Sequence, residues 1–151
     1  MPPGGVTLRP MQRADRAEAL DVWTISWAAA YPAIDFATRR AWMENRLDEL
    51  EAAGAQVRIA LDGTSIAGLV TVDPATGYLD QLVVATTHQR KGIAAILLED
   101  AKRISPRSIT LHVNQDNARA IAFYRKHGFV VSSETVNERS GAPTYAMRWV
   151  A

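Results

Sequence analysis

The 151-residue sequence contains no cysteine, and this absence excludes several chemistries at once. Disulfide bonds, thiolate metal sites and a cysteine nucleophile each require a thiol, so none of them is available. Histidine is scarce as well. The three histidines, His88, His112 and His127, show no metal-ligand spacing. The sequence therefore predicts no protein-bound metal.

Long apolar runs and an excess of one charge are also missing. No apolar stretch is long enough to cross a bilayer, and the beginning of the chain, MPPGGVTLRP, lacks the apolar core of a signal peptide. The net charge of +1 gives no global reason to expect binding to nucleic acid or to an anionic membrane. We therefore expect a cytoplasmic protein with neither kind of partner.

The remaining composition is typical of one globular domain over residues 1–151. Apolar residues make up 48% of the chain and charged residues 22%, which are ordinary proportions. No repeat, low-complexity segment or linker interrupts the sequence. The length is sufficient for a single hydrophobic core.

The segment from Tyr78 to Arg103 has the pattern of a strand, a short loop and a helix. The run of apolar residues that includes positions 79 and 82–84 predicts the strand. Apolar residues then recur at the spacing of one helical face, at Ile93, Ile96, Leu97 and Ala101.

The loop before this helix has the chemistry of an anion site. Gly92 and Ala94 leave room for a ligand to approach the backbone, and Arg90 and Lys91 add positive charge. The first turn of a helix has free N–H groups and the positive end of the helix dipole, which favours a phosphate or pyrophosphate. The alternative is an ordinary turn with basic residues facing water. A Walker A loop and a dinucleotide fingerprint are excluded, because both need further glycines.

The order of predicted elements is β-α-α-β-β-β-α-β-α-β-β. Strands are expected at 6–9, 56–61, 65–72, 79–84, 109–113, from 129 and at 144–150, and helices at 15–30, from 35 or 38 to 53, from 93 and at 118–127. The strand-helix-strand unit over 79–113 predicts a parallel pair with a right-handed crossover. The expected fold class is mixed α/β: a twisted, mostly antiparallel central sheet of about six to seven strands, with helices on both faces.

Two motifs carry a resemblance to a known family. Gln89-x-x-Gly92-x-Ala94 after an apolar strand resembles the acetyl-CoA signature of the GCN5-related N-acetyltransferase (GNAT) superfamily. Residues 117–129, NARAIAFYRKHGF, resemble the Asn-x-x-Ala-x-x-Phe-Tyr-x-Lys-x-Gly-Phe pattern of the same superfamily. Their order and spacing, and the order of elements over nearly the whole chain, are similar to that family's.

The resemblance implies a binding site for acetyl-CoA as co-substrate. Backbone groups of Leu82, Val83 and Val84 would meet the pantetheine arm, which enters between two splayed parallel strands. The pyrophosphate would be bound mainly by N–H groups of the turn formed by Gln89, Arg90, Lys91, Gly92, Ile93 and Ala94. Asn117 would hydrogen-bond the arm, and Tyr124 would lie near the thioester sulfur.

The implied reaction is direct attack of a primary amine on the thioester in a ternary complex. The N–H of Val84, or of Val83, would stabilise the oxyanion. Tyr124 would protonate the departing thiolate as general acid, unless it is a core residue like its neighbour Phe123. Asp80 is the candidate base, with His112 or a water chain as alternatives.

The acceptor is not defined by the motifs. Trp27 and Tyr31 lie on one helical face with Leu20 and Trp23, so they either belong to the core or line a substrate pocket. An acceptor pocket should be built from the first two helices and the 137–143 loop, which carry Trp27, Tyr31, Asp35, Trp42, Glu138 and Arg139. A mixed aromatic and acidic lining would suit a cationic amine. A homodimer through the last strands is compatible with the family.

A second function class stays open. A non-catalytic acyl-CoA-binding sensor or interaction domain would keep both motifs, bind the cofactor and transfer no acetyl group. The presence of Tyr124 favours the enzyme.

Overall fold

The computed structural model describes residues 5–151, so the first four residues, on which part of the signal-peptide expectation rests, lie outside the described residues. The elements follow the predicted order. They are β1 (Val6–Pro10), η2 (Arg13–Asp15), α1 (Arg16–Ala30), η3 (Phe36–Arg39), α2 (Arg40–Ala52), β2 (Gln56–Asp62), β3 (Ser65–Val72), β4 (Leu79–Val84), η4 (Thr86–His88), α3 (Ile93–Ile104), β5 (Ser108–Asn114), α4 (Ala118–Lys126), β6 (Val130–Val136) and β7 (Pro143–Val150).

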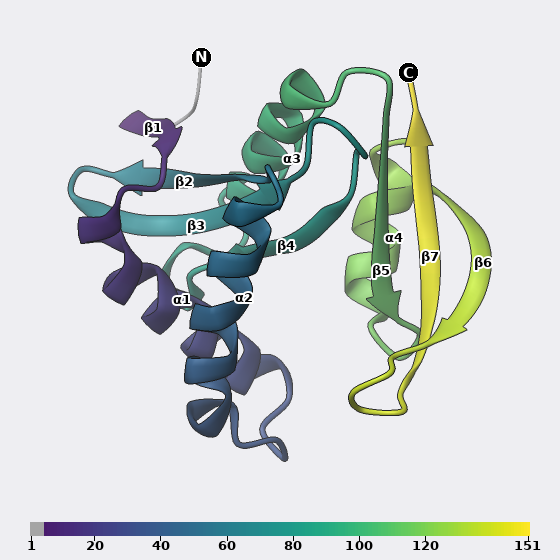
Figure 1. The fold of residues 1–151 in the computed structure, drawn as a ribbon, viewed down its shortest axis with the longest axis horizontal. Coiled ribbons are helices and arrows are strands. Elements are labelled where there is room, and N and C mark those ends of the chain that lie inside the picture. The colour runs from purple at the N-terminus through teal and green to yellow at the C-terminus, as the bar shows by residue number, and fades with distance from the viewer. Residues whose placement is uncertain (1–4) are drawn as a thin grey trace.

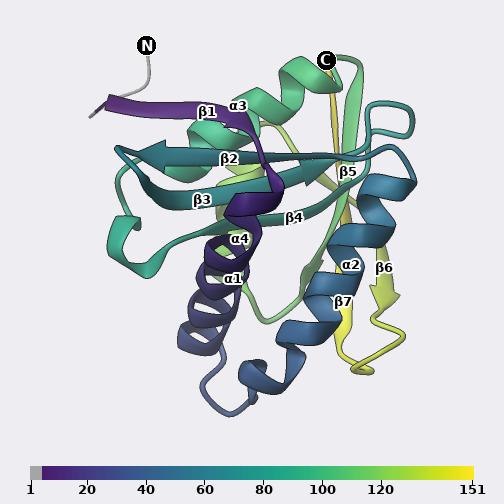
Figure 2. The ribbon, with the colours of Figure 1, turned by 60° about the vertical axis from the view of Figure 1, so that its left-hand side comes forward.

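The first four strands form an antiparallel sheet in the order β1-β2-β3-β4. Adjacent side chains of a strand point to opposite faces, and a bulge at Ala67 shifts this alternation by one residue within β3. Ile66 and Leu69 join the hydrophobic core beneath α1 and α2, whereas Ala67 and Val70 join the core beneath α3. Helices therefore cover both faces of this sheet, as the sequence predicts (Figures 1 and 2).

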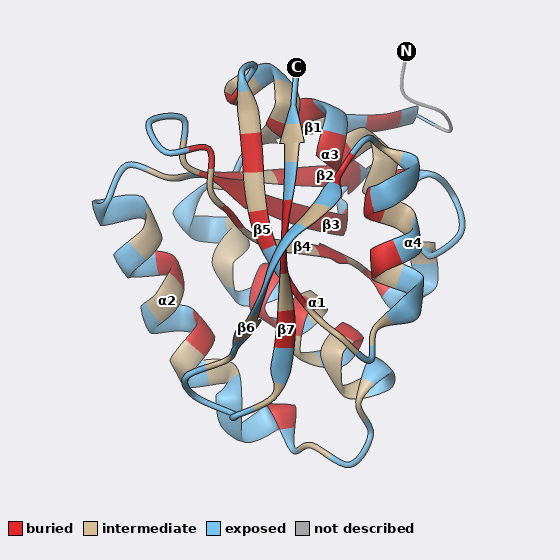
Figure 3. Ribbon diagram, turned by 90° about the vertical axis from the view of Figure 1, so that its right-hand side faces the viewer, coloured by how far each residue is buried: buried red, intermediate tan, exposed pale blue. Residues whose placement is uncertain are grey.

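The last three strands form a second antiparallel sheet in the order β5-β7-β6, and α4 packs beside it. The core beneath α3 continues into this sheet through Leu111 and Met147, and reaches Ile121 of α4. Figure 3 shows the buried residues gathered on the inner strands, while β6 at the edge is largely exposed.

The two sheets meet at one place among the described residues, a parallel bridge between Tyr78 and Thr110. The Thr110 N–H donates to the Gly77 carbonyl oxygen at 3.0 Å. A Cβ on Gly77 would lie 2.6 Å from the Ser108 carbonyl oxygen, so only glycine allows this approach. Beyond the bridge β4 and β5 diverge, which confirms the predicted splayed parallel pair.

The region between α1 and α2 refines one prediction. The sequence places the start of the second helix at Asp35 or Thr38, and the structure has a 3-10 turn before α2 begins at Arg40. Asp35 caps that turn, because its side chain accepts a hydrogen bond from the Ala37 N–H. Across residues 5–151, no helix combines the length and apolar character that a bilayer span requires.

Candidate active site

A cleft of about 1200 Å³ opens where β4 and β5 diverge. Its walls come from α1, α2, β4 and β5, from the start and middle of α4, and from the turn between β6 and β7. The cleft brings together six of the site residues predicted from the sequence, namely Trp27, Tyr31, Asp80, Leu82, Asn117 and Tyr124. The splay thus unites residues that are nearly one hundred positions apart in the chain.

One edge of β4 is open at this divergence. The Ala85 N–H donates to the Ala67 carbonyl oxygen at 2.8 Å, and Val83 lies opposite Leu69 in the same ladder. Backbone groups alternate between the two sides of an antiparallel strand, so the N–H and C=O groups of Val84 and Leu82 point away from β3.

Val83 therefore departs from the expectation. Its N–H and C=O face Leu69 in the ladder, and its side chain is buried in the core beneath α1 and α2. Of the two oxyanion donors that the sequence suggests, Val84 is the one at the open edge. The Val84 carbonyl oxygen accepts a hydrogen bond from the buried Ser26 hydroxyl at 2.8 Å, which fastens this edge to α1.

Tyr124 faces the cleft from α4. Asn117 caps this helix, since its side-chain oxygen accepts from the Ala120 N–H at 3.2 Å, which leaves the side-chain amide free to donate. The Tyr124 ring packs against Phe123 and Phe129, with centroids 5.3 and 5.4 Å away. The residue is only 8% exposed, and no hydrogen bond of its hydroxyl occurs within residues 5–151.

This burial determines the protonation of Tyr124. Removal from water disfavours a phenolate, so burial raises the pKa of Tyr124 above the ordinary value of a tyrosine. The hydroxyl is therefore protonated at neutral pH and has no protein acceptor among the described residues. It can give a proton or a hydrogen bond to a group that enters the cleft, and it is unsuited to act as a base.

Asp80 lies in the cleft wall within a network of hydrogen bonds. Its two oxygens accept from the Arg46 guanidinium at 2.6 and 3.3 Å, and one also accepts from the Gln81 side chain at 3.0 Å. Gln81 in turn accepts from Trp23 Nε1 at 3.1 Å. The hydrogen bond to Asp80 raises the pKa of Arg46, so this guanidinium stays charged. The Asp80 side chain is thus held at one position in the wall of the cleft.

Tyr78 and His112 form a second polar pair beside the bridge between the sheets. The Tyr78 hydroxyl and His112 Nδ1 are 2.7 Å apart, and both residues line the cleft. Burial, with a further contribution from the nearby Asp80 charge, raises the pKa of Tyr78 to about 12. The neutral phenol can therefore donate to Nδ1, in which case the imidazole carries its own proton on Nε2.

Aromatic side chains form the wall on the α1 and α2 side. Trp27 stacks on Tyr31 with centroids 5.7 Å apart and on Phe36 at 6.0 Å. The Tyr31 hydroxyl donates to Asp116 at 3.1 Å and accepts from the Asn114 side chain at 3.1 Å, which joins the end of α1 to the loop after β5. The sequence leaves open whether Trp27 and Tyr31 belong to the core or line a pocket. In the structure they do both, because they are half-buried against the core and also line the cleft.

The turn before α3 lies outside the cleft. Most of its residues are exposed, namely Gln89, Arg90, Lys91 and Gly92, whereas the Ile93 side chain is buried and only its backbone can reach a ligand. Gly92 has a φ of 78° and Arg90 a φ of 65°, both in the left-handed region. The first helical hydrogen bond runs from Ile96 N–H to the Gly92 oxygen, so the N–H groups of residues 93–95 are free for an anion.

Several residues in or next to the cleft carry no sequence signal. Arg46 follows the helical pattern of α2 and looks like an ordinary surface arginine, and Ser26 looks like a small residue in a helix. Tyr78 is recognisable only as the start of the central strand. Their roles depend on partners 34 to 58 positions away in the chain, which no local pattern reveals.

The sequence and the fold match a known family of enzymes. The model of the acetyltransferase (GNAT) family matches residues 16–129, so the chain belongs to this family. It is an acyltransferase, as the resemblance in the sequence implies.

Two relatives are similar along almost their whole length. The peptidyl-lysine N-acetyltransferase YjaB of Salmonella typhimurium (strain LT2) is 26% identical over 139 residues, which cover 91% of this chain and 92% of that protein. The peptidyl-lysine N-acetyltransferase YiaC of Escherichia coli (strain K12) is 25% identical over 144 residues, or 94% of this chain and 95% of that protein.

A solved structure supports the fold independently. The crystal structure of the PaiA N-acetyltransferase from Thermoplasma acidophilum, in complex with coenzyme A, superposes with a TM-score of 0.79 at 18% sequence identity. The match covers 97% of this chain and 99% of the other. The GNAT-like architecture predicted from the sequence is thereby confirmed.

Proposed function

We propose that this acyltransferase uses acetyl-CoA and transfers the acetyl group to a primary amine, by direct attack in a ternary complex. One observation supports this most strongly: the open edge of β4 leads into the same cleft that holds the unpartnered hydroxyl of Tyr124. The open edge provides backbone donors and acceptors for an amide-bearing chain. The Tyr124 hydroxyl provides a proton near the end of that chain.

The residues present fit acetyl-CoA along its length. The backbone N–H and C=O of Leu82 can pair with the amides of the pantetheine arm, the Val84 N–H is left for the thioester carbonyl, and the free side-chain amide of Asn117 can donate to the arm. The N–H groups at the start of α3, with Arg90 and Lys91 beside them, suit the pyrophosphate. That the similar PaiA enzyme is in complex with coenzyme A supports this proposal.

The proposed chemistry assigns one task to each group. Acetyl-CoA supplies the acetyl group as a thioester. The Val84 N–H stabilises the negative charge that develops on the carbonyl oxygen when the amine nitrogen bonds to the carbonyl carbon. Tyr124 gives its proton to the sulfur as the carbon–sulfur bond breaks. Asp80 accepts the proton that the amine gives up, directly or through water. His112 is the alternative acceptor, by way of the Tyr78 hydroxyl, which would take the amine proton as it passes its own proton to Nδ1.

Binding and turnover can be tested with four proteins. We expect the wild type to bind acetyl-CoA in the micromolar range by calorimetry, and Gly92→Glu to lose binding because a carboxylate would stand at the anion site. Gly63→Glu is the matched control, since Gly63 has a similar left-handed φ of 64° in the β2–β3 turn. Tyr124→Phe should bind normally, yet release CoA from an amine library at least about 100-fold more slowly.

Two outcomes would redirect the proposal. Normal binding without acetylation of any amine would favour the non-catalytic acyl-CoA sensor. A folded wild type that does not bind acetyl-CoA would contradict an acetyl-CoA-dependent reaction altogether.

In the same turnover assay, Asp80→Asn and His112→Gln separate the two candidate proton acceptors, because only loss of the true acceptor lowers kcat and changes its dependence on pH.

A further inference from the structure

Two arginines in the cleft have no carboxylate partner within the described residues. Arg39 and Arg139 both line the cleft, and neither forms an ion pair in residues 5–151. The third cleft arginine, Arg46, is bound by Asp80 at 2.6 Å and by Glu49 at 3.4 Å. Unlike Arg46, the first two retain their full capacity to bind an anion.

Both guanidiniums are supported by aromatic rings of the cleft wall. The Arg139 guanidinium lies 4.1 Å from the centroid of the Trp42 ring, and that of Arg39 lies 5.3 Å from Phe36. Phe36 and Trp42 each contact Trp23, with centroids 5.8 and 6.2 Å away, so the two supporting rings belong to one cluster. A guanidinium placed on a ring keeps its N–H groups free at the edge of its plane.

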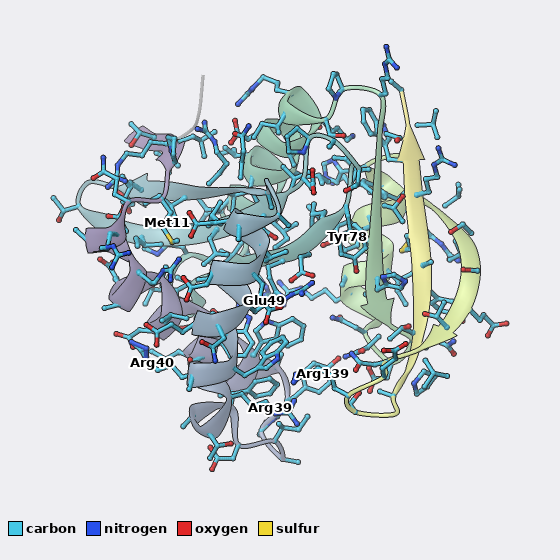
Figure 4. All side chains as sticks on the ribbon, viewed as in Figure 1. Met11, Arg39, Arg40, Glu49, Tyr78 and Arg139 are labelled. Atoms are coloured by element: carbon cyan, nitrogen blue, oxygen red, sulfur yellow. The ribbon has the colours of Figure 1, made fainter. Side chains whose placement is uncertain are left out.

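The two arginines come from opposite walls of the cleft. Arg39 is at the end of η3, next to α2, and Arg139 is in the turn between β6 and β7 (Figure 4). That turn is ordered by Asn137, whose side chain accepts from the N–H groups of Arg139 and Ser140 at 2.9 and 3.1 Å. The Arg139 side chain thus already reaches across to Trp42 of α2, and an anion bound by both guanidiniums would reinforce this link between the walls.

We infer that the acceptor molecule carries a carboxylate near its amine, and that Arg39 and Arg139 bind this carboxylate. This inference rests on the proposed function and narrows its acceptor class. A guanidinium matches a carboxylate with two parallel hydrogen bonds. The cleft also contains Asp116, which no cationic side chain pairs among the described residues, and the exposed Glu138, so it presents charges of both signs to such an amphoteric acceptor.

Matched pairs of amines test the inference. Nα-acetyl-L-lysine and its amide differ only in the free carboxylate, and the peptides acetyl-Glu-Lys-amide and acetyl-Gln-Lys-amide place the same difference on a neighbouring side chain. Affinity is measured by calorimetry with CoA-saturated protein, and turnover by CoA release. We expect at least one carboxylate to bind about tenfold more tightly than its neutral partner, the effect of one charge-assisted hydrogen bond, and the preference to weaken with salt.

The variants make the result specific. The double variant Arg39→Gln with Arg139→Gln should reduce the preference for the carboxylate to less than about twofold. The reason is that it removes the charge-assisted hydrogen bonds, one of which accounts for a preference of about tenfold. Arg40→Gln should keep it, because Arg40 lies outside the cleft and pairs with Asp21 at 3.0 Å. A preference within the first pair assigns a free amino acid, and one within the second assigns an acidic peptide.

Three results overturn the inference: equal affinity for acid and neutral partners, no binding of either pair, or a preference that survives in the double variant. Failure of the proposed function is distinguishable from these results. A protein that acetylates neutral and acidic amines equally well remains an acetyltransferase, whereas one that binds the carboxylates but not acetyl-CoA does not use the proposed donor.

Discussion

Two tyrosines in the cleft are held in their neutral form by different surroundings. Tyr124 is enclosed by Phe123 and Phe129, and burial alone raises its pKa. Tyr78 is less enclosed and lies near the charge of Asp80, and its pKa is raised to about 12. Each therefore keeps its proton at neutral pH, which is one condition for the general acid that the proposed reaction needs.

These shifts predict a loss of stability in alkali. Below about pH 10, the pKa of a tyrosine in an unfolded chain, both states keep the protons and the shifts have no effect. Above it the unfolded chain binds fewer protons than the native protein, so the free energy of unfolding must fall as the pH rises. Urea unfolding at pH 9, 10 and 11 should show this decline, and Tyr78→Phe and Tyr124→Phe should each reduce its slope.

Absorbance of tyrosinate provides the direct check. In the native wild type, the signal from Tyr78 should develop near pH 12 and that from Tyr124 later still. Ionisation of all four tyrosines together near pH 10 in the native protein would contradict the burial of these two.

Among single residues, the sequence identifies those that belong to a motif. It misses those whose role comes from a contact with a residue far away in the chain. Tyr124 and Asn117 are found because one helix carries both, at a spacing that the family shares. Arg46 and Ser26 are missed because their roles arise from contacts with β4, 34 and 58 positions away. The apolar run of β4 predicts a strand, but which residues face the open edge depends on its pairing with β3.

The turn that leads into α3 combines the proposed anion site with an unusual backbone. Arg90 and Gly92 both have positive φ values, and a side chain at such a position costs free energy. No atom lies within 4 Å of a Cβ added to Gly92, so the space there is open to a ligand. The conformation turns the first N–H groups of α3 toward solvent.

Gly92→Ala should separate strain from ligand binding. We expect it to lower the free energy of unfolding by about 1 kcal/mol through its left-handed backbone, and to weaken acetyl-CoA binding as well. Gly63→Ala should show a similar loss of stability and normal binding, because its positive φ and open surroundings match those of Gly92. Equal acetyl-CoA affinities in the two variants, measured by calorimetry, would contradict an anion site at Gly92.

Element boundaries were predictable where side-chain periodicity extends to the end of the element. The strand at 65–72 agrees with β3 in full, and the helix at 118–127 differs from α4 by one residue. The start of α1 was less clear. Asp15 looks like a helix cap, but its side chain accepts instead from the guanidinium of Arg9 and the N–H of Gln12, and η2 precedes the helix. A local preference was overridden there by an ion pair with a neighbouring strand.

The molecule as a whole consists of two sheets that share one junction. Gly77 lies at this junction, with no room for a side chain against the Ser108 carbonyl. The sequence predicts the parallel pair of strands, because a helix connects them. The extent of the gap follows from how the two hydrophobic cores pack, and a single sequence does not contain that information.

Gly77→Ala should therefore affect both halves of the protein. The methyl group would have to displace β5, and we expect a loss of about 3 kcal/mol in unfolding free energy from overpacking and a left-handed φ of 76°. Acetyl-CoA affinity should fall too, because the distance between β4 and β5 defines the cleft. Gly63→Ala is again the control, with strain but no clash. Unchanged affinity in a folded Gly77→Ala variant would show that the junction does not determine the width of the cleft.

The open edge of β4 also bears on how far such a protein can diverge. Its donors and acceptors belong to peptide groups, which every amino acid except proline supplies equally. Substitutions at Leu82 or Val84 can change packing but cannot erase this part of the site. An architecture of this kind tolerates extensive drift in sequence, which is consistent with a TM-score of 0.79 between chains that share 18% of their residues.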